Sequence, residues 1–137
     1  MITQLKTTLL AVIILFGDSP DGFAQDLVTA SEAYKSGDYA TALKEWKLLA
    51  EQGNSEAQFR LSWMYYDGTG VVQDKVYAHM WVNLAAANAA TLEYHDIVRE
   101  VIAFSSRNRF AREMTPSQIE KAMDLARECV KKEYKGC

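Results

Sequence analysis

The sequence predicts an all-α fold, a short α-α superhelix of two helical hairpins followed by a C-terminal capping helix. Apolar residues recur at spacings of three and four along most of the chain, as on one face of an α-helix. Glycines separate these segments where helix ends and turns are needed. Two tryptophans, Trp46 and Trp81, lie 35 residues apart in similar surroundings. A repeat of this length is typical of helical-hairpin solenoids.

Length and composition fit one globular domain. The chain has 137 residues, of which 49% are hydrophobic and 24% are charged, so a packed core is feasible. The formal net charge is −3 at pH 7, and no basic stripe compensates for it locally. Because nucleic-acid-binding domains usually carry a basic patch, we expect no nucleic-acid partner.

Residues 1–24 resemble a secretory signal. Lys6 precedes an apolar run over 9–16, and a small-x-small sequence ends at Ala24. This run is shorter than the roughly 20 apolar residues that span a bilayer. These features are typical of a cleavable signal peptide, with a membrane anchor or a buried helix as the alternative. We therefore expect a signal peptide over 1–24 and no stable membrane insertion after cleavage.

The remaining chain, 25–137, is predicted to form the helical domain, and its first repeat covers about 26–53. Apolar residues at helical spacing predict a short amphipathic helix that Gly37 ends. Asp38 then offers an N-cap for a second helix, which Gly53 closes.

The second repeat is predicted over about 54–89. Its first helix is expected over 55–67, where Ser55 and Gln58 have the spacing of a capping box. A glycine-containing loop follows, and Asp74 offers the N-cap of the next helix.

The two hairpins are related by internal similarity. Trp81 follows Trp46 by 35 residues, whereas Tyr65 follows Tyr34 by 31. The difference falls in the loop between the two helices of each hairpin, which is longer in the second. Repeats usually vary in this way, with core spacing kept and loops lengthened.

Several positions of the second hairpin match a known repeat pattern. They are Leu61, Met64, Tyr65, Gly68, Gly70, Val71, Asp74, Ala78, Trp81, Ala85 and Ala86. This set resembles the Sel-1-like repeat, a short relative of the tetratricopeptide repeat, and it covers one full repeat. The sequence departs from the family pattern at Ser62, where glycine is usual, and at Tyr77, where lysine is frequent. Neither difference changes the helical period.

The resemblance implies a role as well as an architecture. It implies a non-catalytic adaptor or scaffold, whose concave surface holds an unidentified protein or peptide, in the periplasm of a Gram-negative bacterium or secreted from it. Some exported members of the family are linked to cell-wall chemistry, so the alternative is a cell-wall-directed hydrolase or a binder of cell-wall ligands.

The C-terminal segment, 90–137, is expected to be helical as well. Ile97, Val101 and Phe104 indicate one helix, and the sequence leaves open whether it is interrupted near 105–108.

The last helix has a stronger start signal. Thr115 is a capping residue, Pro116 takes the first helical position and Gln118 completes a capping box. The predicted buried stripe of this helix is Ile119, Ala122, Met123, Ala126 and Val130. In a solenoid, a terminal helix covers the apolar face that the last repeat leaves open.

The sequence contains no motif for a catalytic or metal site. His79 and His95 are not at a metal-ligand spacing, and we expect both at the helix surface. A catalytic triad built from Ser62 or Ser105 with one histidine would lack a neighbouring sequence motif that activates the serine. We therefore expect no enzyme, no cofactor and no metal.

The cysteines, Cys129 and Cys137, are candidates for a disulfide, because an exported protein meets an oxidising compartment. Eight residues of continuous helix span about 12 Å, which is too far for a disulfide. The helix must therefore end first, at Gly136 or within 133–135. Free thiols and an interchain bridge are the alternatives.

One aromatic strip is the candidate binding surface. Phe59, Trp63 and Tyr66 are placed opposite the core stripe of their helix, with Arg60 and Asp67 at the edge. The alternative is that neighbouring helices sandwich this helix and bury the strip. The accessibility of Trp63 decides between these interpretations.

Overall fold

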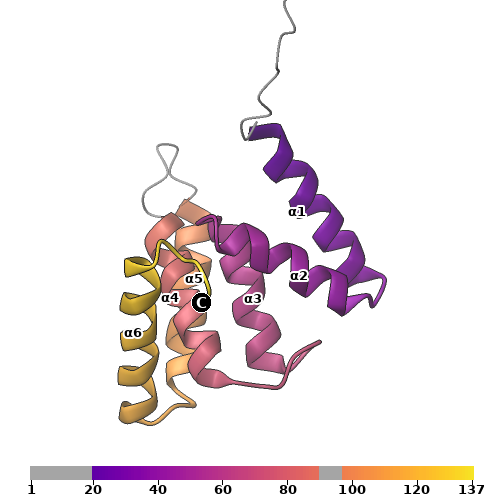
Figure 1. Ribbon diagram of the computed structural model, residues 1–137. Helices are drawn as coiled ribbons and strands as arrows, with labels where there is room; N and C mark the ends of the chain where they lie inside the picture. Colours follow the sequence, from indigo (N-terminus) through magenta and orange to yellow (C-terminus); the bar gives the residue numbers. More distant parts are fainter. Residues whose placement is uncertain (1–19, 90–96) are drawn as a thin grey trace, which may run out of the picture.

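The computed structural model describes residues 20–89 and 97–137, and this part of the chain forms six α-helices and no strand (Figure 1). The prediction of an all-α fold is confirmed. Helices α1 to α4 pack consecutively, and α4 also packs against α5 and α6. Helix α6 lies at the opposite side of the molecule from α1 (Figure 1). Most of the predicted signal peptide, 1–19, and the segment with His95 fall outside the described residues.

The first hairpin consists of α1, Pro20–Lys35, and α2, Tyr39–Ala50. Helix α1 begins six residues before the expected start at residue 26. Asp38 is the N-cap of α2, as predicted, and its carboxylate accepts a hydrogen bond from the backbone N–H of Thr41 at 3.1 Å. Hydrogen bonding from the side chain of Thr41, and then from its backbone N–H, holds the pKa of Asp38 below its usual range.

The second hairpin consists of α3, Ser55–Asp67, and α4, Lys75–Ala89. The N-cap of α4 is Asp74, whose carboxylate accepts from the backbone N–H of Tyr77 at 3.0 Å. The bounds of α3 agree with the prediction.

The predicted capping box at the start of α3 is wrong. Asn54 is the N-cap, and its side-chain oxygen accepts from the backbone N–H of Ala57 at 2.9 Å. Ser55 is already the first helical residue, so Gln58 is not needed at the cap. Gln58 is fully buried and bonds to other elements instead.

Beyond the second hairpin lie α5, Ile97–Ala111, and α6, Pro116–Lys131. Helix α5 runs through 105–108, so the interruption left open by the sequence is absent. The capping box of α6 is confirmed, because the hydroxyl of Thr115 accepts from the N–H of Gln118 at 3.2 Å and the side chain of Gln118 accepts in return at 2.8 Å.

The buried face of α6 is narrower than predicted. Ala122 and Cys129 are buried with Ala126 packed beside them, whereas Met123 is 46% exposed and Val130 is 52% exposed. Met123 and Val130 each follow a buried residue and therefore lie about 100° further round the helix. Because α6 packs mainly against α4, Met123 stays exposed, and Val130 lies at the rim of the contact, where it lines a depression with Asn83, Leu84 and Ala87 of α4.

The core connects both hairpins. Trp46 of α2 and Trp81 of α4 are 2% and 1% exposed, and both belong to one continuous apolar cluster. Each occupies the second helix of its hairpin, and each indole N–H lacks a hydrogen-bond acceptor. A second cluster joins α3, α4 and α5 and contains Tyr66, Ala78, Val82, Ala103 and Phe110.

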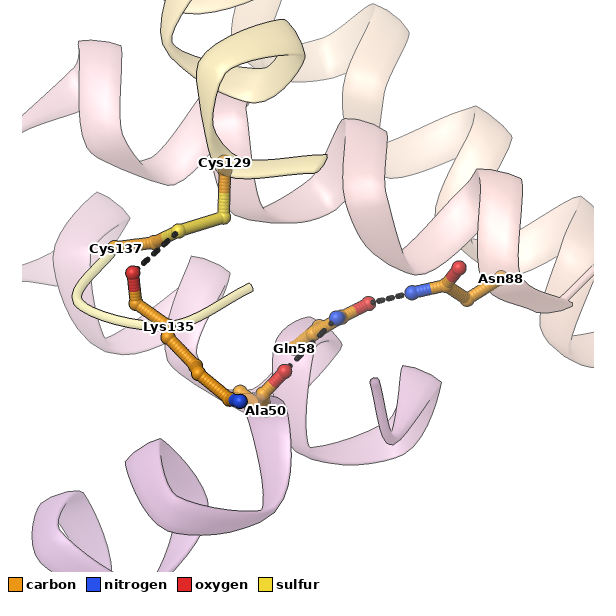
Figure 2. Close-up of a disulfide and its surroundings, with 6 residues drawn as sticks. All are labelled: Ala50, Gln58, Asn88, Cys129, Lys135 and Cys137. Carbon is orange, nitrogen blue, oxygen red and sulfur yellow. Dashed lines mark hydrogen bonds between the residues drawn. A yellow bond between two sulfur atoms is a disulfide. The ribbon is translucent and has the colours of Figure 1, made fainter. Parts of the chain in front are cut away.

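Three side-chain hydrogen bonds follow one another through the molecule, and Figure 2 shows the first two, between Ala50, Gln58 and Asn88. The amide of Gln58 donates to the carbonyl of Ala50 at 3.1 Å, which also accepts from the backbone N–H of Gly53 at 3.0 Å at the end of α2. The amide of Asn88 donates to the oxygen of Gln58 at 2.9 Å, and the hydroxyl of Tyr134 donates to the oxygen of Asn88 at 2.8 Å. The chain of bonds therefore links α2, α3, α4 and the C-terminal loop.

A disulfide closes the C-terminal loop (Figure 2). Cys129 and Cys137 are bonded, and their Cα atoms lie 5.6 Å apart. The helix ends before the loop, as a bridge at this spacing requires, and the chain reverses through positive φ at Glu133, Tyr134 and Gly136. This reversal also directs the Tyr134 ring toward the α2–α3 turn, where a Cβ added to Gly53 would lie 3.3 Å from it.

We predict that Gln58→Ala lowers the free energy of unfolding by about 1–3 kcal/mol, because it removes the buried side chain and its two hydrogen bonds, to Ala50 and to Asn88. Gln52→Ala is the matched control, because Gln52 is exposed in the neighbouring turn, and its effect stays within about 0.5 kcal/mol. Urea denaturation of both variants measures the difference. Equal effects would contradict a role for the buried amide.

A second prediction concerns the contact between the C-terminal loop and the α2–α3 turn. Gly37 and Gly53 have φ of +85 and +84, but an added Cβ meets nothing within 4 Å at Gly37. Gly37→Ala therefore costs about 1 kcal/mol for the left-handed backbone alone, whereas Gly53→Ala costs about 1 kcal/mol more through the Tyr134 ring. Thermal denaturation measures both, and the excess disappears in a Tyr134→Ala background. If the extra cost of Gly53→Ala persists in the Tyr134→Ala background, a contact other than the Tyr134 ring causes it.

Candidate functional site

The predicted aromatic strip of α3 is divided by helix α5. Tyr66 is 7% exposed, so its assignment to an exposed strip is wrong. Its ring stacks on Phe110 of α5 with ring centroids 4.2 Å apart. Trp63 meets the same ring edge-on at 5.1 Å and is only partly buried, as is Phe59. One end of the strip is thus sandwiched between helices, while Phe59 and Trp63 keep accessible surface.

The accessible part of the strip faces a groove of about 330 Å³ between the first hairpin and α3. The lining residues are Tyr34 of α1, Trp46 of α2, and Phe59, Arg60, Trp63, Met64 and Asp67 of α3. We call this feature the aromatic groove. It contains four of the five predicted binding residues.

Two groove residues were not predicted as binding residues, although the repeat comparison marked both. Tyr34 and Trp46 lie with ring centroids 5.3 Å apart across the first hairpin. Their role at the groove depends on how that hairpin packs against α3, which short-range patterns do not reveal.

The charged groups of the groove differ in their partners. Arg60 donates through Nε to the carboxylate of Glu56 at 2.7 Å, one turn earlier on α3. The carboxylate of Asp67 is exposed, and the described part of the chain supplies no ion pair for it.

A polar cluster connects the end of α3 to the start of α4 and to the segment after α5. The hydroxyl of Tyr66 donates to one oxygen of Glu113 at 2.5 Å, and Lys75 donates to the other oxygen at 2.9 Å. These bonds lower the pKa of Glu113 and raise the pKa values of Tyr66 and Lys75. The guanidinium of Arg109 lies 5.3 Å from the centre of the Trp63 ring. Trp63 is therefore supported from the side of α5.

The expected surface position of His79 is wrong. The side chain is 3% exposed, and its Nδ1 accepts from the amide of Asn83 at 2.9 Å. Helix α4 is covered by α3, α5 and α6, so residues beside the Trp81 stripe are buried too. Burial, and to a smaller extent the nearby charge of Arg107, lower the pKa of His79.

The two serines considered for a catalytic triad lie in different surroundings. Ser62 is buried and donates to the carbonyl of Phe59 at 2.7 Å within its own helix, and Ser105 is exposed. The buried polar side chains among the described residues are Gln58, Ser62, His79 and Ser106, and none is a carboxylate. Over 20–89 and 97–137, no cluster of three or more histidine, cysteine or acidic side chains has the geometry to hold a metal ion.

Comparisons of the chain with protein-family models, with curated proteins and with solved structures find no match. Within the described ranges, no helix combines the length and the apolar character needed to cross a membrane. The structure thus defines an all-α, repeat-like protein with one disulfide and one aromatic groove.

The lowered pKa of His79 predicts a pH dependence of stability. An unfolded chain takes up a proton near the ordinary value of 6.5, whereas the folded chain keeps His79 neutral to lower pH. The free energy of unfolding therefore falls as pH drops below about 6.5, by at most about 1.4 kcal/mol per pH unit. Urea denaturation between pH 7.5 and about 5 measures this slope, and His79→Gln reduces it. An unchanged slope in the variant would assign the effect to other groups.

Proposed function

We propose that this chain is a non-catalytic protein–protein interaction module, an adaptor or scaffold that holds a segment of a partner protein in the aromatic groove. The observation that carries the proposal is the convergence of Tyr34, Trp46, Phe59 and Trp63 from three helices on one groove. Aromatic side chains supply most of the energy at many protein interfaces, especially in pockets that exclude water.

The rigidity of the groove supports this role. Trp46 is held in the core, Trp63 is braced by Phe110, and α3 is bonded near both ends to other elements. A binding surface that is already ordered loses little conformational entropy when the partner arrives. A groove of this kind fits one or two side chains and the backbone between them.

We also propose that the protein is a small Sel-1-like repeat protein of the bacterial envelope, either periplasmic or secreted. Two hairpins with a buried tryptophan on each second helix, followed by α6, are consistent with that repeat architecture. The Cys129–Cys137 disulfide is consistent with an oxidising compartment, and the signal-like segment 1–24 predicts export.

The proposed function predicts that the groove selects peptides. Peptides enriched from a random display library on the full 137-residue chain lose at least about tenfold in affinity on Phe59→Ala, because this change removes one aromatic wall. Phe104→Ala is the matched control, since Phe104 is 51% exposed on α5 outside the groove. Fluorescence anisotropy measures both affinities, and circular dichroism verifies that the variants fold. Failure to enrich any peptide, or equal loss in both variants, contradicts the proposal.

A further inference from the structure

The two charged residues that line the aromatic groove, Arg60 and Asp67, are not paired with each other. Arg60 forms an ion pair with Glu56 within α3, at an Nε–Oε1 distance of 2.7 Å. Asp67 carries an exposed carboxylate without an ion pair among the described residues. Asp67 is therefore the charged lining residue that is free to pair with a partner, and charge complementarity favours a cationic group there.

The positions on α3 place this carboxylate in line with the aromatic rings. Phe59, Trp63 and Asp67 follow one another at intervals of four residues, so they lie along one face with a rise of about 6 Å per step. All three line the groove. A cation that rests against the Trp63 ring is thus about one helical turn from the carboxylate of Asp67.

Aromatic faces attract cations through the negative potential above the ring. The protein already uses this attraction on the same aromatic surface. The guanidinium of Arg109 lies 5.3 Å from the Trp63 ring centre and 5.7 Å from that of Tyr66. A guanidinium or ammonium group supplied by a partner meets similar chemistry on the groove side, with the Asp67 carboxylate as its counter-charge.

We propose that the aromatic groove binds a partner segment that places a lysine or arginine side chain against the aromatic rings beside Asp67. Apolar side chains flank this basic residue and pack on the remaining apolar wall, which Tyr34, Phe59 and Met64 provide. The inference rests on the proposed function, because it states the chemistry of the partner at the same groove. An acidic segment is the opposite outcome, in which Arg60 exchanges Glu56 for the partner.

Three capped pentapeptides test the charge preference. They are Ala-Leu-Arg-Leu-Ala, the same sequence with citrulline in place of arginine, and the same sequence with glutamate. Citrulline keeps the shape of arginine and removes its charge. Each peptide is titrated into the full chain, and NMR follows the indole N–H signals of Trp46 and Trp63. Trp81, which is buried outside the groove, is the internal control.

The arginine peptide is expected to shift the Trp63 signal and to bind at least about threefold tighter than the citrulline peptide. Asp67→Asn reduces this difference, because it removes the carboxylate, keeps the side-chain shape and leaves the aromatic rings in place. Glu120→Gln is the matched control, since it changes the net charge equally at an exposed position of α6 and leaves the difference intact.

Three results would overturn the inference. Equal affinity for the arginine and citrulline peptides, or tighter binding of the glutamate peptide, excludes a preference for a cation while a peptide-binding groove remains. No shift of Trp63 with any of the three peptides also excludes the proposed segment. The proposed function is judged separately by the display experiment, since library peptides that depend on Phe59 support it whatever their charge.

Discussion

The arrangement of the helices depends on one buried amide. Gln58 is fully buried, and both ends of its side chain are used, since it donates to Ala50 of α2 and accepts from Asn88 of α4. A buried amide without these partners would cost free energy, so this packing of α2, α3 and α4 is favoured over alternatives that leave it unpaired. Tyr134 extends the constraint to the C-terminal loop, which the disulfide closes. The orientation of the first hairpin relative to α3 follows from this set of bonds.

That orientation creates the aromatic groove. Helix α3 is held near its start by Gln58 and near its end by Tyr66, which bonds to Glu113. Phe59 and Trp63 lie between these two points and face the first hairpin. The groove is thus a consequence of polar bonds at both ends of one helix and apolar packing between them. Such a pre-formed surface suits a binding module, because little ordering is left for the partner to impose.

Local signals in the sequence predicted the elements, and long-range packing decided the exposure of side chains. The caps at Asp38, Asp74 and Thr115 are formed by residues three positions apart and were predicted correctly. The pair Ser55 and Gln58 has the same spacing, but Gln58 bonds to other helices, so that prediction was wrong. The end of α6 before Cys137 followed from helix geometry on the condition that the two cysteines form an intrachain bridge. By contrast, Tyr66 and His79 are buried because α5 and its neighbours cover them, and no short-range pattern contains that information. The same limit explains why Tyr34 and Trp46 were identified as repeat positions and not as groove residues. The function itself has no comparable local signal, because its residues converge from three helices.

The most direct test of this account is the solution NMR spectrum of the Gln58 side-chain amide in the full chain. Two resolved amide protons that exchange slowly with solvent, with nuclear Overhauser effects to the side chain of Asn88 and to the end of α2, are the expected result. Amide protons that exchange rapidly, or effects that connect Gln58 to the backbone N–H groups of its own first turn, would contradict the account. In that case the first hairpin would be held on α3 by apolar packing alone, and the polar bond that this account places at the base of the aromatic groove would be absent.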